Sequence, residues 1–171
     1  MAEEGVRYLG KYRGSVVNNI DPLQKGRIQV MVPNVLPPGP SSWAMPCLPS
    51  AGIQAGVWTV PPVGAGVWVE FEQGDIDYPI WVGCWWGSAA EVPALALAAQ
   101  PGAPNILLQT VGQNTVLLSD LPGGPGITLK GRTGAMIVIN DAGILISNGQ
   151  GAMITLTGPT VTINQTALVV T

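Results

Sequence analysis

The sequence predicts an all-β protein, with a small N-terminal barrel followed by an elongated β-structure that several copies of the chain build together. Three observations predict it. Apolar residues alternate through the last two-fifths of the chain, as in Ile137 and Ile139, which is typical of short β-strands. Turn signals such as Asn148-Gly149 and Gly158-Pro159 separate these segments. Only 10% of the residues are charged, so much of the surface is expected to be buried in an assembly.

The N-terminal region contains five or six candidate strands and no helical pattern. Between the first two, Asp21-Pro22 begins a turn that ends at Lys25-Gly26, because proline presets φ and glycine allows a left-handed conformation. The proline-rich segment 33–40 is expected to be a surface loop. Short strands without helices favour a small closed barrel, such as the five-stranded OB type. The expected strands are residues 12–19, 27–32, 42–46, 66–72 and 80–86.

The composition changes near residue 90. All ten aromatic residues lie between Tyr8 and Trp86, and 13 of the 17 charged residues lie at or before Glu91. A segment rich in proline and alanine follows and indicates a connector. The sequence therefore predicts an OB-like domain at 1–90, a linker at 91–104 and a second domain at 105–171.

The C-terminal region contains eight candidate strands. A single chain that meanders in this way leaves unpaired strand edges, which favour aggregation. Three chains wound together would pair those edges and enclose an apolar centre, so we expect a trimeric, interleaved β-helix with the form of a prism. At ~4.8 Å per layer, eight layers give a length of roughly 40 Å. Its polar outer faces would carry Thr128, Thr155, Thr162 and Asn164. The expected strands are residues 106–110, 115–119, 126–130, 135–140, 143–147, 152–157, 160–164 and 167–170.

Composition argues against several functions. Seven basic residues and a net charge of −3 are too few cations for a nucleic-acid-binding face. The chain has no histidine and no nucleophile set beside a base, so we expect no catalytic, cofactor or metal site. A cluster of carboxylates could form a glycosidase-type pair, but its place on one strand face and in a turn favours a solvated edge. The cluster is Glu70, Glu72, Asp75 and Asp77.

No targeting segment or cysteine framework is predicted. No apolar run approaches the ~18 residues of a membrane-spanning helix. The N-terminus lacks the basic start and apolar core of a signal peptide, so we expect assembly in the cytoplasm. Cys47 and Cys84 are expected to be two buried thiols, with a disulfide between them as the alternative.

Ordered motifs in the N-terminal region resemble one family. They are Asp21-Pro22 with Gly26-Arg27-Ile28-Gln29-Val30, then Ser42-Trp43-Ala44-Met45-Pro46, and most specifically the block from Val67 to Gly87, VWVEFEQGDIDYPIWVGCWWG. Over residues 12–87 the chain is similar to the OB-fold domain of phage baseplate assembly protein V, the central tail spike of contractile phages. The same domain occurs in the valine-glycine repeat spikes of type VI secretion and in extracellular contractile injection systems.

The resemblance implies a homotrimer whose OB domains lie at the base of a pointed β-helical needle, in a virion tail baseplate or injection-system particle. The implied partners are the other two copies, a baseplate hub protein and, indirectly, the inner tube, with the target membrane contacted transiently. The resemblance is to the minimal spikes: the connector has no room for a lysozyme-like insertion, and the chain is expected to lack the large hub domain that is fused ahead of the barrel in type VI spikes. Without histidine, a histidine-bound metal at the tip cannot be carried over.

Tryptophans of the first region are candidates for core or trimer contacts rather than for ligand stacking. Adjacent strand residues point to opposite faces, so at least one of Trp85 and Trp86 lies outside a single barrel. We expect that indole to pack against a neighbouring subunit or the needle base. The candidate aromatic residues are Trp43, Trp81, Trp85 and Trp86.

The apolar C-terminus allows two interpretations. It is either the last strand of the prism or a flat end that receives a tip protein of the proline-alanine-alanine-arginine repeat type. The candidate contact residues are Leu168, Val169, Val170 and Thr171.

The predicted function is that of a non-enzymatic trimeric spike that punctures the target envelope. One alternative is an OB-fold module for single-stranded nucleic acid or oligosaccharide, which trimeric state and absent phosphate dependence would distinguish. Another is an enzyme that degrades cell wall, which zymography would test.

Overall fold

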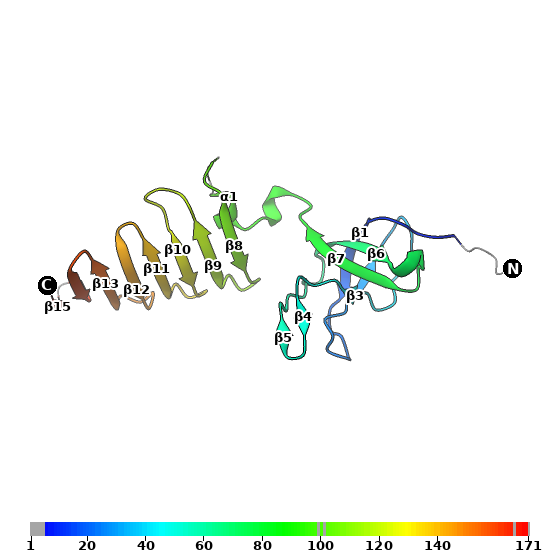
Figure 1. The fold of residues 1–171 in the computed structure, drawn as a ribbon, viewed down its shortest axis with the longest axis horizontal. Helices are drawn as coiled ribbons and strands as arrows, with labels where there is room; N and C mark the ends of the chain where they lie inside the picture. The colour runs from blue at the N-terminus through cyan, green and yellow to red at the C-terminus, as the bar shows by residue number, and fades with distance from the viewer. Residues whose placement is uncertain (1–5, 99, 101, 166, 171) are drawn as a thin grey trace. The chain divides into compact units, whose positions relative to one another are not determined.

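A computed structural model describes residues 6–98, 100, 102–165 and 167–170 (Figure 1). The chain divides into two compact units, residues 1–91 and 92–171. Almost all regular structure in the described residues is β, so the predicted all-β class is confirmed.

The N-terminal unit is a five-stranded sheet that curls into a barrel. The strand order is β2-β1-β6-β7-β3, antiparallel except where β3 pairs with β7. A bridge between Ile28 and Ala44 joins the segments before β2 and β3, so the two edges of the sheet meet. This closure gives the OB-like barrel that the sequence predicts. Its strands are β1 (Tyr12–Asn18), β2 (Gln29–Met31), β3 (Met45–Pro46), β6 (Gly66–Phe71) and β7 (Pro79–Trp85).

One hairpin of this unit was not predicted. Strand β4 (Ala51–Gly52) pairs with β5 (Ala55–Gly56) in a separate two-stranded sheet. Each of these strands has only one alanine and one glycine, so no period-two pattern marks them in the sequence. The hairpin lies between β3 and β6 in the chain and borders an open groove described below.

The barrel core consists of alternate strand residues. In β6, Val67, Val69 and Phe71 are buried as the alternation predicts, and Trp68 and Glu70 between them are half-buried. Burying a large apolar side chain contributes about 1.5–3 kcal/mol, so this cluster is the main source of the unit's stability. The other buried members are Val16, Ile28, Val30, Val32, Ala44 and Trp81.

The predicted turn between β1 and β2 is built around the carboxylate of Asp21. Its oxygens accept hydrogen bonds from the backbone N–H groups of Leu23 (2.9 Å) and Lys25 (2.8 Å), and from Nη2 of Arg27 at 2.6 Å. The hydrogen bond from the Arg27 side chain, helped by these backbone donors, holds the pKa of the Asp21 carboxyl well below its usual range, although burial acts in the opposite direction. The ion pair therefore ties the turn to the start of β2.

Asp21→Asn is expected to lower the free energy of unfolding of the barrel at pH 7, by an amount that shrinks in acid. Because the pKa of Asp21 is lower in the folded chain, its stabilisation is fully present above the unfolded-state value of about 3.9. The contribution is then lost as the pH falls toward the folded-state pKa. Denaturant unfolding followed by tryptophan fluorescence between pH 7 and pH 3 measures this. Asp75→Asn, in a turn where the carboxylate accepts the Asp77 N–H, is the control. If Asp21→Asn lowers the free energy of unfolding by the same amount at every pH, the ionised Asp21 carboxylate is not the source of the stabilisation.

The C-terminal unit is an eight-stranded antiparallel sheet whose strands follow one another in chain order (Figure 1). It is preceded by a one-turn helix, α1 (Ala94–Leu97), which the sequence did not predict; alanine and leucine favour helix once Pro93 has begun the turn. All eight predicted strands are present. They are β8 (Asn105–Gln109), β9 (Thr115–Ser119), β10 (Ile127–Lys130), β11 (Met136–Asn140), β12 (Gly143–Ser147), β13 (Met153–Thr157), β14 (Thr160–Ile163) and β15 (Leu168–Val170).

The expectation that these strands take their backbone partners from other copies is wrong for β9 to β14. Each of them pairs on both sides with its neighbours in the same chain. Short turns bring consecutive strands together at a small cost in loop entropy, so the nearest strand is the favoured partner. Among the described strands of this sheet, only β8 and β15 have an outer edge with no strand beside it. Contact between copies therefore has to use mainly the faces of the sheet.

Candidate assembly surface

One face of the C-terminal sheet is made entirely of aliphatic side chains. The ladder places Ile137 opposite Leu129 and Ile146, and Ile139 opposite Ile127 and Ile144. The same register continues through every strand, so each contributes two residues to two parallel columns. We call this surface the aliphatic face: Ile106, Leu108, Val116, Leu118, Ile127, Leu129, Ile137, Ile139, Ile144, Ile146, Ile154, Leu156, Val161, Ile163, Leu168 and Val170.

The described residues of the C-terminal unit do not cover the aliphatic face. Most of its side chains are exposed and the remainder are half-buried. Scaled by the fraction of each side chain that is still exposed, burial of this set would contribute on the order of 10 kcal/mol, which is comparable with the whole stability of a typical domain. A continuous apolar surface of this extent marks an interface. The sheet is thus one layer of a structure that needs a second layer from outside the chain.

The opposite face is mixed and more polar. The expected outer residues Thr128, Thr155 and Thr162 lie on this face, with Thr155 directly opposite Thr162. Thr128, however, is only 7% exposed, and its hydroxyl donates to the Pro125 carbonyl at 3.0 Å, so it does not contribute to a solvated surface as expected. Asn164 lies in the turn after β14, where its side-chain oxygen accepts a hydrogen bond from the Met153 N–H at 3.0 Å. Helix α1 contacts β8 on this side, since Asn105 Nδ2 donates to the Leu95 carbonyl. The two faces therefore differ as an inner and an outer surface should.

The candidate tip residues fall in and after the last strand. Leu168 and Val170 extend the two aliphatic columns to the end of the sheet. Val169 lies between them in β15, paired in the ladder with Thr162. Thr171 lies outside the described residues. Whether these positions contact a tip protein stays a prediction.

In the barrel, the predicted tryptophans occupy different environments. Trp81 is only 4% exposed within the core, and its Nε1 donates to the Gly26 carbonyl at 3.1 Å. Trp43 is half-buried at the surface, with the guanidinium of Arg27 5.4 Å from its ring centre. The Arg27 side chain therefore links Trp43 to the Asp21 turn.

Trp85 and Trp86 are held differently. The Trp85 indole crosses Gly66, where a Cβ would collide with the ring, and its Nε1 donates to the Val67 carbonyl at 3.2 Å. The guanidinium of Arg13 lies 5.2 Å from the Trp85 ring and 5.6 Å from that of Trp68. Trp86 is 62% exposed. Its packing against a neighbouring subunit or the needle base stays a prediction.

Two models of known protein families match this chain, and together they cover most of it. Residues 12–86 match the type VI secretion system/phage-baseplate injector OB domain. Residues 105–169 match the phage baseplate V C-terminal trimerisation domain. The chain belongs to the phage baseplate V spike family. A comparison with curated proteins gives no match.

Membership of the baseplate V family explains the uncovered aliphatic face. The matched C-terminal domain is a trimerisation domain, which supports a homotrimer. The matched range, residues 105–169, contains nearly all of the aliphatic face. The family is a structural one, and its members belong to the tail baseplate or to the related injector.

The carboxylates that could suggest a catalytic or metal site do not act together as a pair. Glu70 forms an ion pair with Lys11, and the Asp75 carboxylate accepts the Asp77 N–H, so the carboxylates are engaged singly. Among the described residues, no three histidine, cysteine, aspartate or glutamate side chains are placed to hold a metal ion. None of the described helices has the length and apolar character needed to span a membrane.

The cysteines were expected to be buried, and this is wrong. Both Cys47 and Cys84 are free and exposed. Cys47 follows the short edge strand β3, and Cys84 follows Gly83, where φ is +152° and the β6–β7 register shifts. Such a bulge reorients the following residues, which the alternation of the sequence does not reveal. Partial burial nevertheless raises the pKa of the Cys84 thiol.

In the predicted strands β8, β9 and β15, the pairs Ile106/Leu108, Val116/Leu118 and Leu168/Val170 extend the aliphatic face to both ends of the sheet. Sequence reasoning missed the exposed Trp58 beside the β4–β5 hairpin, for which no alternation gives a signal.

Proposed function

We propose that three copies of this chain form the central spike of a contractile injection machine and that the spike punctures the target envelope mechanically, without a catalytic step. The observation that carries the proposal is the aliphatic face, which one chain leaves exposed along all eight strands. Three such faces turned toward a common axis would enclose a dry prism, with the threonine-bearing faces outside. This arrangement replaces the interleaved backbones expected from the sequence.

Force transmission would depend on two sets of contacts. Within each chain, the ladder hydrogen bonds stack the strands in order, so a push along the stack compresses them instead of separating them. Between chains, the aliphatic columns would resist sliding because interiors are close-packed. Since one sheet could not leave without exposing the other two, the trimer would be kinetically stable, and we expect it to resist SDS at room temperature.

The proposed partners follow from this arrangement. The OB collar would bind a baseplate hub protein that connects it to the inner tube, and the target membrane would be contacted only on firing. The residues that would receive a tip protein of the proline-alanine-alanine-arginine repeat type are Leu168, Val169, Val170 and Thr171. Assembly would take place in the cytoplasm before the particle is released.

Electron cryotomography of particles carrying this chain, before and after they fire on target cells, tests the puncturing role. We expect trimeric density for the chain at the distal end of the inner tube, and beyond the outer surface of the target envelope after sheath contraction. A tag at the N-terminus of the chain identifies the density. Density that stays on the outer surface of the target after contraction would overturn puncturing while leaving the structural role intact.

A further inference from the structure

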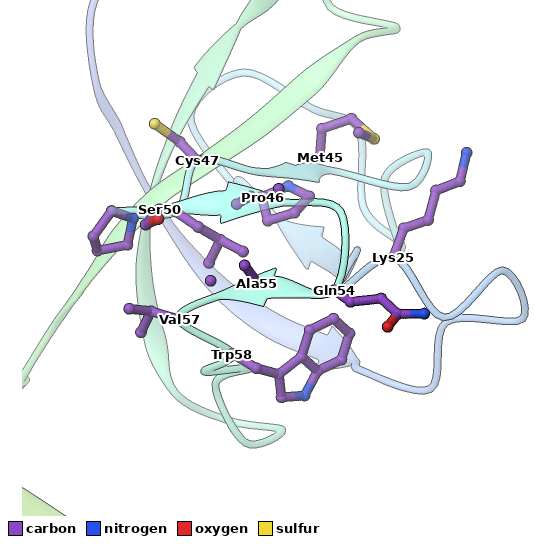
Figure 2. A pocket seen from close by; sticks show the side chains of 14 residues that line it. Lys25, Met45, Pro46, Cys47, Ser50, Gln54, Ala55, Val57 and Trp58 are labelled. Atoms are coloured by element: carbon purple, nitrogen blue, oxygen red, sulfur yellow. The ribbon is translucent and has the colours of Figure 1, made fainter.

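A large hollow borders the barrel beside the β4–β5 hairpin (Figure 2). It is an open groove of about 880 Å³, with the hairpin on one side and the segment that follows β3 on the other. Trp58, which follows the hairpin, and Lys25, from the Asp21 turn, are among the residues that line it (Figure 2). We call it the hairpin groove. The Trp58 ring lies next to Gly26, since a Cβ on Gly26 would meet it at an ordinary van der Waals distance.

The lining of the hairpin groove is apolar and nearly uncharged. Met45, Leu48, Val57 and Trp58 contribute most of its large side chains, and Trp58 is still 64% exposed. Of the side chains that line it, only Lys25 carries a charge. A surface of this composition offers little attraction to a strongly charged partner, and it would gain most from an uncharged apolar group.

The tip of the hairpin supplies such a group on the same subunit. Ile53 is 99% exposed, and the following residue, Gln54, has the left-handed φ of +53° that closes the turn. The two strands of the hairpin close tightly on each other at its base, where the Val57 N–H donates to the Ser50 carbonyl at 3.0 Å and a Cβ on Gly56 would press on the same oxygen. The hairpin therefore presents an isoleucine at the end of a short two-stranded support.

We infer that Ile53 of each subunit docks in the hairpin groove of the next subunit, so that three hairpins close a ring in the OB collar. A threefold interface is heterologous: every subunit must carry two different complementary patches, one projecting and one recessed. The hairpin tip and the groove are such a pair. Because both belong to one small region of the barrel, they can meet their counterparts only near the threefold axis. The inference rests on the trimer of the proposed function, and it adds a second interface to that of the aliphatic face.

Cysteine cross-linking tests this directly, because native Cys47 already lines the groove. The variant Ile53→Cys is made with Cys84→Ser, which removes the other native thiol, and is treated with a short bismaleimide. A covalent trimer requires two reactive thiols on every subunit, one on each side of the contact. We expect most of the protein to run as covalent trimers on a denaturing gel. Leu9→Cys with Cys84→Ser is the matched control; Leu9 is 72% exposed but does not line the groove, so it should give only a background amount.

The outcomes separate the inference from the proposed function. Adding Cys47→Ser to the Ile53→Cys variant should abolish covalent trimers, because one thiol per chain can join only two subunits. If light scattering shows a trimer but no covalent trimer forms, the ring inference is overturned and the spike stands. Cross-linking of the Ile53→Cys variant to a co-expressed hub protein, through the thiol introduced at the hairpin tip, would also overturn it. A chain that is not trimeric at all would overturn both.

Discussion

Ile146→Asp is expected to abolish the trimer. Ile146 lies in the middle of the sheet, paired with Ile137 on one side and Ile154 on the other, so its side chain belongs to the aliphatic face. The substitution removes about 1.5–3 kcal/mol of apolar burial in each subunit. It also brings three carboxylates toward one apolar axis, and burying each costs several kcal/mol more. Sedimentation or light scattering should show loss of the species with three times the 17.7 kDa mass of the chain.

Ser147→Asp provides the matched control for this variant. Ser147 is the next residue of β12 and therefore lies on the opposite face, where its Oγ accepts a hydrogen bond from the Gly149 N–H at 3.1 Å. An aspartate can accept the same bond and stay solvated, so this variant should remain trimeric. Two trimeric variants, or two monomeric ones, would show that the inner and outer faces have been assigned wrongly.

The strands could be predicted from the sequence because their signals are local. Alternation and turn residues mark β8 to β15 within one or two residues, and the same alternation gives the buried positions of β6. Which strands pair is a different matter, since the ladder depends on the turns and on the register of the whole sheet. The alternation of apolar residues does not reveal whether other copies of the chain contact the strand edges or a face of the sheet. We predicted contact through backbone pairing at the edges, whereas the structure leaves the aliphatic face exposed.

Surface details of the barrel were harder to predict for a similar reason. The bulge at Gly83 exposes Cys84, and the Trp85 indole settles over Gly66 from the neighbouring strand. Neither contact has a trace in local sequence, because each joins residues from two different strands. The β4–β5 hairpin has only alanine and glycine in its strands, so strand propensity gives no signal for it.

Gly143→Ala is expected to disrupt the same sheet from within. Gly143 begins β12 with a φ of +138°, a conformation that an L-residue adopts at a cost of about 1–3 kcal/mol. A Cβ there would also overlap the carbonyl oxygen of Leu156 on β13, so the two strands would have to separate. Because β13 to β15 are attached to the rest of the sheet through β12, separation would loosen the C-terminal end of all three chains. The temperature at which the trimer dissociates should fall sharply, with faster hydrogen exchange in β13 to β15.

Gly151→Ala separates the two causes. Gly151 also has a positive φ, +103°, but no atom lies within 4 Å of the Cβ that alanine would add. Gly151→Ala should therefore lower the free energy of unfolding only by the ~1–3 kcal/mol that backbone strain costs. We expect Gly143→Ala to lower it by at least twice as much. Equal losses in the two variants would mean that β12 and β13 can move apart freely. A sheet with that freedom could not transmit axial force, so the comparison bears on the spike's mechanism as well as on its stability.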